Sequence, residues 1–209
     1  MATILQARRG LLAMMLCVAL ACFAQDMSSN GGCWVRVYSL KNALPFSSLA
    51  KDDQAKVLRA LGDDIREMAE LDVAGSLTSR AAYRNYFAAH LEFKSLPETT
   101  GAENLLLVRY NSSTMCGSSD NCPVWVVRLT SSGAQSMVPW QDEHMGTSVG
   151  GGWGVGERLT PASQYPELMV LTHLSSTQTG LACFQESKRS YLRVECAPEC
   201  ARLFEHRER

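Results

Sequence analysis

The sequence lacks an excess of charge of either sign. Its 20 lysines and arginines nearly balance its 21 aspartates and glutamates, which gives a formal net charge of −1. The basic residues gather in no dense patch and in no basic amphipathic helix. Binding to nucleic acid or to a membrane surface normally needs one of these features. We therefore expect neither as a partner.

Long apolar runs are also absent, except near the N-terminus. There, Arg8 and Arg9 precede an uncharged stretch from Gly10 to Ala24, which ends in small residues where a signal peptidase would read them. A membrane-spanning helix needs about 20 apolar residues, and Gln25 follows too soon for that. A basic start, a short apolar middle and a small-residue end are typical of a secretory signal peptide. We expect residues 1–24 to be removed on export to the periplasm or the cell exterior.

After removal of the signal peptide, we expect the chain to form one domain. Residues 25–32 are polar and end in glycine, which predicts a flexible arm, and the length of 33–209 suits a single domain with its own core. We expect no membrane span in this mature chain. Lipoprotein anchoring through Cys22 is the less favoured alternative, because Ala19 and Leu20 fit a lipobox poorly.

Cysteine, by contrast, is frequent. Loss of Cys17 and Cys22 with the signal peptide reduces the eight cysteines to an even number, which in an exported chain indicates disulfides. Cys116 and Cys122 enclose small turn-forming residues, and an apolar strand follows. Redox-active pairs usually have two intervening residues at a helix N-terminus. We therefore predict a structural Cys116–Cys122 bridge.

The pairing of the other four cysteines stays open, because spacing alone does not determine connectivity. A Cys183–Cys196 bridge across a hairpin, with Cys33 joined to Cys200, is one arrangement. Zinc would need a second close pair of ligands beside Cys196 and Cys200, and none is evident. We expect structural disulfides and no metal.

Cofactor-binding motifs are missing as well. Gly150–Gly156 has neither the dinucleotide fingerprint nor the P-loop lysine. His144 has Asp142 and Glu143 beside it, which offers a carboxylate–histidine pair. We predict no catalytic, cofactor-binding or metal-binding residue. Gly150–Gly156 is expected to be a flexible loop, and its Trp153 is a candidate partner contact because loops often carry binding function.

One amphipathic helix is predicted, from about Leu49 to Leu71. Its apolar residues recur every three or four positions and so share a face that would pack on a sheet. Cys33–Tyr38 predicts an edge strand, and the alternation over Phe87–Lys94 predicts a half-buried strand. The apolar face of the helix consists of Val57, Leu58, Leu61, Ile65 and Met68.

The rest of the chain predicts strands separated by turns. No long helical pattern lies between them, so antiparallel pairing is favoured over parallel β-α-β units. Leu105–Ser113 and Leu168–Ser176 have similar patterns, and each begins a three-strand unit. We therefore predict an α+β fold in which the N-terminal amphipathic helix packs on a mainly antiparallel sheet of two related three-strand units, stabilised by disulfides. The strands are expected at Leu105–Tyr110, Val124–Leu129, Ala134–Val138, Leu168–His173, Leu181–Glu186 and Tyr191–Cys196.

Several short strings resemble a known class of proteins. The segments Cys116-Gly117, Asn121-Cys122-Pro123 and Trp125-Val126, followed by Pro166–His173, are similar to exported bacterial proteins with strand repeats distantly like the FG-GAP or VCBS type. The resemblance implies repeated β-structure and no particular activity. Such relatives commonly have Asp- and Asn-rich turns suited to calcium. The matching turns here have too few carboxylates for calcium, so we predict none.

These observations favour an exported, non-enzymatic binding or interaction module. Its partner would be a protein or a component of the cell envelope, contacted through loops. The alternative is a hydrolase or another enzyme whose site is assembled in space and has no recognisable motif.

Overall fold

The computed structural model describes residues 27–30, 33–73, 75–96, 104–118, 121–137, 150–152, 154–158, 165–174, 179–188 and 190–200. The predicted signal peptide and the predicted strand end at Val138 lie outside this described part of the chain.

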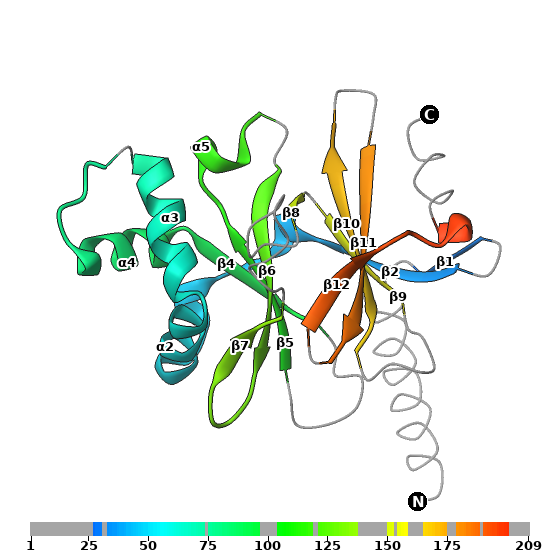
Figure 1. Ribbon diagram of the computed structural model, residues 1–209, viewed down its shortest axis with the longest axis horizontal. Coiled ribbons are helices and arrows are strands. Elements are labelled where there is room, and N and C mark those ends of the chain that lie inside the picture. Colours follow the sequence, from blue (N-terminus) through cyan, green and yellow to red (C-terminus); the bar gives the residue numbers. More distant parts are fainter. Residues whose placement is uncertain are drawn as a thin grey trace, which may run out of the picture.

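The described strands form two six-stranded sheets, and neighbouring strands in both are antiparallel. The outer sheet has the order β1 (Met27–Asn30), β2 (Cys33–Ser39), β9 (Gly154–Arg158), β10 (Glu167–His173), β11 (Thr179–Ser187) and β12 (Ser190–Val194). The central sheet has the order β3 (Leu44–Pro45), β4 (Leu91–Ser95), β5 (Asn104–Tyr110), β6 (Cys122–Leu129) and β7 (Ala134–Ser136), and β8 (Gly150–Gly152) pairs with β6. Figure 1 shows the helices, the central sheet and the outer sheet as three layers.

The prediction of one sheet is therefore wrong in its detail. The two three-strand units are β5-β6-β7 and β10-β11-β12, and they belong to different sheets that face each other. Each unit is extended by a strand that precedes it, β4 or β9. Period-two patterning identifies a strand and its buried face, but it does not say which sheet the strand joins.

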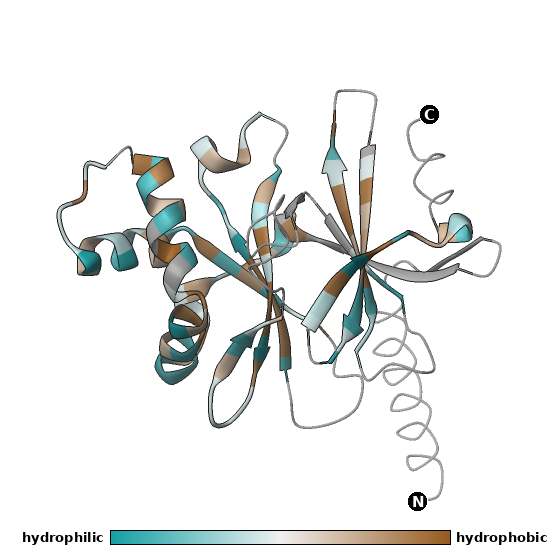
Figure 2. Ribbon diagram, in the orientation of Figure 1, coloured by the Kyte–Doolittle hydropathy of each residue, from teal (hydrophilic) through white to brown (hydrophobic). Residues whose placement is uncertain are grey.

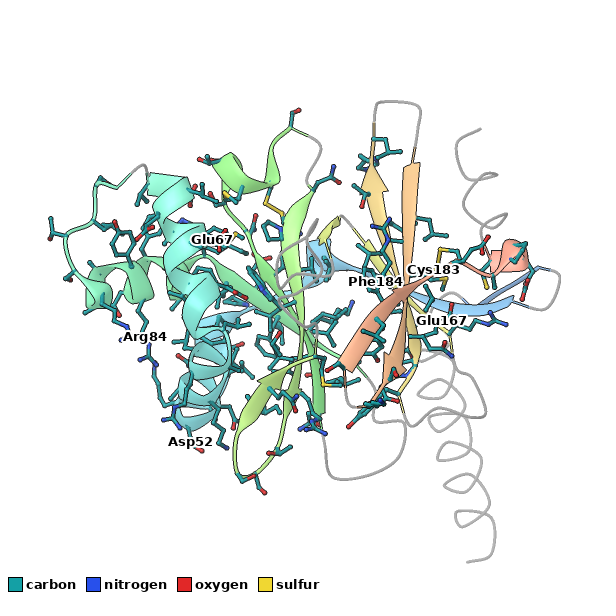
Figure 3. The ribbon with its side chains drawn as sticks, in the orientation of Figure 1. Asp52, Glu67, Arg84, Glu167, Cys183 and Phe184 are labelled. Atoms are coloured by element: carbon teal, nitrogen blue, oxygen red, sulfur yellow. A yellow bond between two sulfur atoms is a disulfide. The ribbon has the colours of Figure 1, made fainter. Side chains whose placement is uncertain are left out.

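The apolar core between the sheets explains this arrangement. Leu105 and Leu107 on β5 pack with Leu168 and Val170 on β10, and all four are buried. The side chains between them on β5, such as Leu106, point to the opposite face and into the helical core. Strand β5 is thus buried on both faces, and so its sequence reads as a continuous apolar run and not as an alternation. In the outer sheet, Phe184 and Cys183 likewise point to opposite faces of β11 (Figure 3).

Two predictions near the N-terminus need correction. The arm predicted over 25–32 includes β1, which pairs with β2 over Met27–Asn30. Strand β2 pairs on its other side with β9, so Cys33–Tyr38 is not at an edge. Backbone pairing accounts for both differences, because it is available to polar segments that have no hydrophobic pattern of their own.

Three helices cover the free face of the central sheet: α2 (Lys51–Ala60), α3 (Gly62–Val73) and α4 (Arg80–Ala89). The helix predicted from about Leu49 to Leu71 is thus two helices that meet at Leu61. At this junction Leu61 N donates a hydrogen bond to Val57 O, and Ile65 N donates one to Leu61 O, both 3.0 Å long. The helical hydrogen bonding therefore continues from α2 into α3. Figure 2 shows that α2 mixes hydrophilic and hydrophobic residues along its length.

The strand predicted over Phe87–Lys94 is wrong in its first half. Phe87 lies on α4 and is fully buried among the helices and the central sheet, and β4 begins only at Leu91. The alternation of apolar and polar residues over 87–93 therefore comes from two elements. Its first part is the buried face of helix α4, and its second part is the buried face of strand β4. Ser79 is the signal for the helix, because its Oγ accepts a hydrogen bond from Ala82 N at 3.1 Å and caps α4.

Each of the two sheets contains a strand that is held by a disulfide. Cys116, at the end of the short helix α5 (Ser113–Cys116), is bonded to Cys122 at the start of β6, with Cα atoms 4.0 Å apart. Cys183 on β11 is bonded to Cys196 beyond β12. Cys200 is also disulfide-bonded, and the Cys33–Cys200 pair stays a prediction.

Candidate functional site

The loop residues singled out in the sequence do not form a site in the structure. Gly150–Gly152 and Gly154–Arg158 are strands β8 and β9, so most of the expected flexible glycine loop is paired backbone. Trp153, His144, Asp142 and Glu143 lie outside the described residues. A partner contact at Trp153 therefore stays a prediction.

The structure instead has a cavity of about 490 Å³ among α2, α3 and α4. This volume is in the range of pockets that bind small molecules. Figure 3 shows Arg84, one of the lining residues, on α4. The lining comprises Leu58, Arg59, Gly62, Ile65, Thr78, Ser79, Arg80, Tyr83 and Arg84.

Three arginines give this cavity a strong positive character. Arg59 comes from the last turn of α2, and Arg80 and Arg84 come from α4. Within the described part of the chain, none of the three forms an ion pair or hydrogen bond, and no acidic residue lines the cavity. The capping residue Ser79 also lines the cavity, so α4 begins at its wall.

Another part of the lining is apolar. Leu58 on α2 and Ile65 on α3 contribute aliphatic surface, and Tyr83 contributes a ring from α4. Ile65 is only 6% exposed, because it also belongs to the core between the helices and the central sheet. The cavity therefore combines cationic and apolar chemistry in one space.

A cluster formed by the Asp72 carboxylate and its hydroxyl partners fixes α3 and α4 to the central sheet beside the cavity. Asp72 Oδ2 accepts hydrogen bonds from the hydroxyls of Tyr86 at 3.0 Å and Tyr110 at 2.8 Å. Asp72 Oδ1 accepts from Ser112 Oγ at 2.6 Å, and Thr114 is a further partner. Asp72 lies in the last turn of α3, Tyr86 lies on α4 and Tyr110 ends β5, so one side chain joins three elements.

The same contacts shift the ionisation of these groups. Burial alone would raise the pKa of Asp72, but the hydrogen bonds from its hydroxyl partners outweigh burial and lower that pKa below its ordinary value. Burial raises the pKa of Tyr110, and its bond to the Asp72 carboxylate raises it further. Burial and the same carboxylate also raise the pKa of Tyr86. Asp72 is thus held ionised, with its phenolic partners protonated.

This cluster does not have the geometry of a catalytic triad. Ser112 donates directly to Asp72, whereas a serine nucleophile needs a base such as histidine between it and the acid. His90 Nδ1 instead lies 2.9 Å from the carbonyl oxygen of Tyr86. The cluster is therefore best understood as an anchor for the helices.

A second anchor lies at the start of α3. Trp125 on β6 donates its Nε1–H to Asp64 Oδ2 at 2.8 Å, and Asp64 is only 4% exposed. Phe87 on α4 stacks on Tyr110, with ring centroids 4.8 Å apart, and meets Trp125 edge-on at 5.8 Å. The two anchors hold α3 near its start and near its end, and the Asp72 cluster also holds α4.

Sequence reasoning missed the cavity because no helix was predicted over the segment that contains Arg80 and Arg84. The available signal was Ser79 as a helix cap, followed by Tyr83 and Phe87 four residues apart. Recognising α4 would have placed Arg80 and Arg84 on one helix face.

Other site types find no support in the described residues. No group of three or more histidine, cysteine, aspartate or glutamate residues there could hold a metal ion. The helices described are all too short or too polar to cross a membrane. Comparison of the chain with protein-family models, curated proteins and solved structures gives no match. The resemblance to FG-GAP or VCBS repeats stays a prediction.

Proposed function

We propose that the chain is an exported, non-enzymatic binding module that takes its ligand into the cavity among α2, α3 and α4. The observation that carries this proposal is the cavity itself. It has about 490 Å³ of space, apolar walls and three arginines without a partner in the described chain. Concave sites of this size with a few convergent polar groups are typical of small-molecule binding.

The lining favours binding over catalysis. General acid–base chemistry usually needs a histidine or carboxylate, and nucleophilic catalysis needs a hydroxyl or thiol next to a base. The lining residues that the structure describes include neither a histidine nor a carboxylate, and the Ser79 hydroxyl caps α4. The arginines can hold a ligand but do not exchange protons at neutral pH.

An extracytoplasmic location supports an envelope component as the ligand. Two disulfides between described cysteines suit an oxidising compartment. The N-terminal sequence predicts a signal peptide. Disulfides and a signal peptide fit the outside of the cell as well as the periplasm, so the cell exterior stays the alternative location.

The test uses the neutral fluorescent probe N-phenyl-1-naphthylamine with the mature, oxidised protein. We expect saturable binding of one probe per chain. Replacement of Gly62 by tryptophan should abolish it by filling the cavity. Gly62 suits this test because a Cβ added there meets no atom within 4 Å. Gly62→Ala is the matched control and should bind as the unmodified chain does.

Two results would contradict the proposal. One is the absence of saturable binding to the unmodified chain. The other is unchanged binding by Gly62→Trp, in a variant whose circular dichroism spectrum and unfolding midpoint match those of Gly62→Ala.

A further inference from the structure

We infer that the cavity among α2, α3 and α4 selects an amphiphilic anion, with a carboxylate or phosphate group held by Arg59, Arg80 and Arg84. The apolar part of the ligand would lie against the side chains of Leu58, Ile65 and Tyr83. This inference rests on the proposed function and adds the chemical class of the ligand.

The charge pattern of α4 is the main argument. Arg80 and Arg84 are four residues apart, so they are neighbours on one face of the helix, where two like charges repel. Arg80 also lies in the first turn, where the helix dipole disfavours a cation, and that turn has no acidic residue. A bound anion would relieve both unfavourable interactions at once.

Three buried or half-buried basic side chains elsewhere in the protein are paired with carboxylates. On α2, Lys56 Nζ lies 2.9 Å from Asp52 and 3.0 Å from Asp53. Arg109 pairs with Glu92, and Arg158 lies 3.3 Å from Glu199. The three arginines around the cavity are exposed and have no carboxylate partner in the described part of the chain, so their guanidinium groups are accessible to a ligand.

The side chains in the lining also define the kind of anion. Guanidinium groups present a planar set of donors that matches the two oxygens of a carboxylate or the oxygens of a phosphate. A small inorganic anion would use these donors but would leave the apolar walls in contact with water. A ligand with an oxyanion at one end and an apolar body would satisfy both surfaces.

The test compares two fluorescent probes that differ by one charged group. 1-Anilinonaphthalene-8-sulfonate carries an oxyanion on the same ring system as neutral N-phenyl-1-naphthylamine. We expect the mature, oxidised protein to bind the sulfonate at least about tenfold more tightly, because charge-assisted hydrogen bonds are worth at least that factor. This preference should decrease as salt is added.

Variants separate the charge effect from the cavity itself. The double variant Arg80→Gln, Arg84→Gln should lose the preference for the sulfonate, measured as the ratio of its affinities for the two probes. Arg193→Gln, at an exposed position of β12, is the matched control and should retain the preference. Gly62→Glu should reverse the preference through an added carboxylate, whereas Gly62→Gln, which is nearly the same size, should not.

The outcomes distinguish this inference from the proposed function. Equal affinity for the two probes, or a preference that persists in the double arginine variant, would overturn the anion inference and leave the binding cavity intact. Failure of both probes to bind would remove the proposed function as well.

Competition with natural headgroup chemistry completes the test. Decanoate and decyl phosphate, each below its micelle concentration, should displace the sulfonate probe more effectively than decanol does, and their ranking identifies the headgroup. Displacement by inorganic phosphate as strong as that by decyl phosphate would overturn the amphiphilic part of the inference.

Discussion

Tyr110 donates its phenolic hydroxyl to the carboxylate of Asp72, 2.8 Å away, and so ties the end of strand β5 to the end of helix α3. Tyr110 is fully buried, and its ring stacks on Phe87 of α4. One contact therefore connects the central sheet with the two helices that carry most of the cavity. Neither residue lines the cavity, but both contact the helices that do.

Replacement of Asp72 by asparagine should destabilise the protein. The amide is neutral, and its NH₂ group would face hydroxyls that now donate to a carboxylate. Loss of charge-assisted hydrogen bonds of this kind costs about 1–3 kcal/mol. Urea unfolding measures the change. Glu67→Gln, at an exposed position of the same helix, is the control, and equal stability of the two variants would contradict the anchoring role.

The stability of the fold should also decrease in acid because of Asp72. Its pKa is lower in the folded chain than its ordinary value of 3.8. Such a carboxyl stabilises the fold fully above the unfolded pKa, and the contribution is lost as the pH falls through the lower folded pKa. Urea midpoints measured from pH 6 downward should therefore decrease less steeply for Asp72→Asn than for the unmodified chain. Parallel curves would argue against a lowered pKa at Asp72.

Truncation of Phe87 to alanine should cost about 3–5 kcal/mol, the usual range for a large buried aromatic side chain. Phe87 is fully buried and contacts the rings of both Tyr110 and Trp125. Leu71→Ala provides the comparison, because Leu71 is 59% exposed and its truncation should change stability by less than about 0.5 kcal/mol. A small loss for Phe87→Ala would mean that α4 does not pack on the sheet as described.

Removal of the Cys116–Cys122 bridge should have a moderate effect. The loop is short, with a sequence separation of 6, and the chain-entropy model assigns about 2 kcal/mol to its closure. The double variant Cys116→Ser, Cys122→Ser should lose about that much in urea unfolding and still bind N-phenyl-1-naphthylamine. Non-reducing peptide mapping should link the two cysteines in the unmodified chain. Free thiols at both positions would contradict the bridge.

The sequence was informative where burial determines the pattern. The apolar runs at Leu105–Tyr110 and Leu168–His173 are strands, because burial on both faces favours apolar residues at successive positions. The sequence was less informative for β1, β8 and β9. Those strands are polar or glycine-rich, and backbone pairing holds them in the sheets.

The cavity could not be predicted for a different reason. Arg59 and Arg80 are far apart in the sequence, and only the packing of α2 beside α3 and α4 brings them to one space. The misassigned alternation at Phe87 concealed α4, although Ser79 marks its start. Local patterns therefore predicted elements, and the site arose from their three-dimensional arrangement.

A crystal structure of the mature protein with 1-anilinonaphthalene-8-sulfonate would test the central claim most directly. The account predicts that the probe occupies the cavity among α2, α3 and α4, with its sulfonate within hydrogen-bond distance of the guanidinium groups of Arg80 and Arg84. Its rings should lie against Leu58 and Tyr83. A structure with the probe bound elsewhere and this cavity filled only by water would contradict the account.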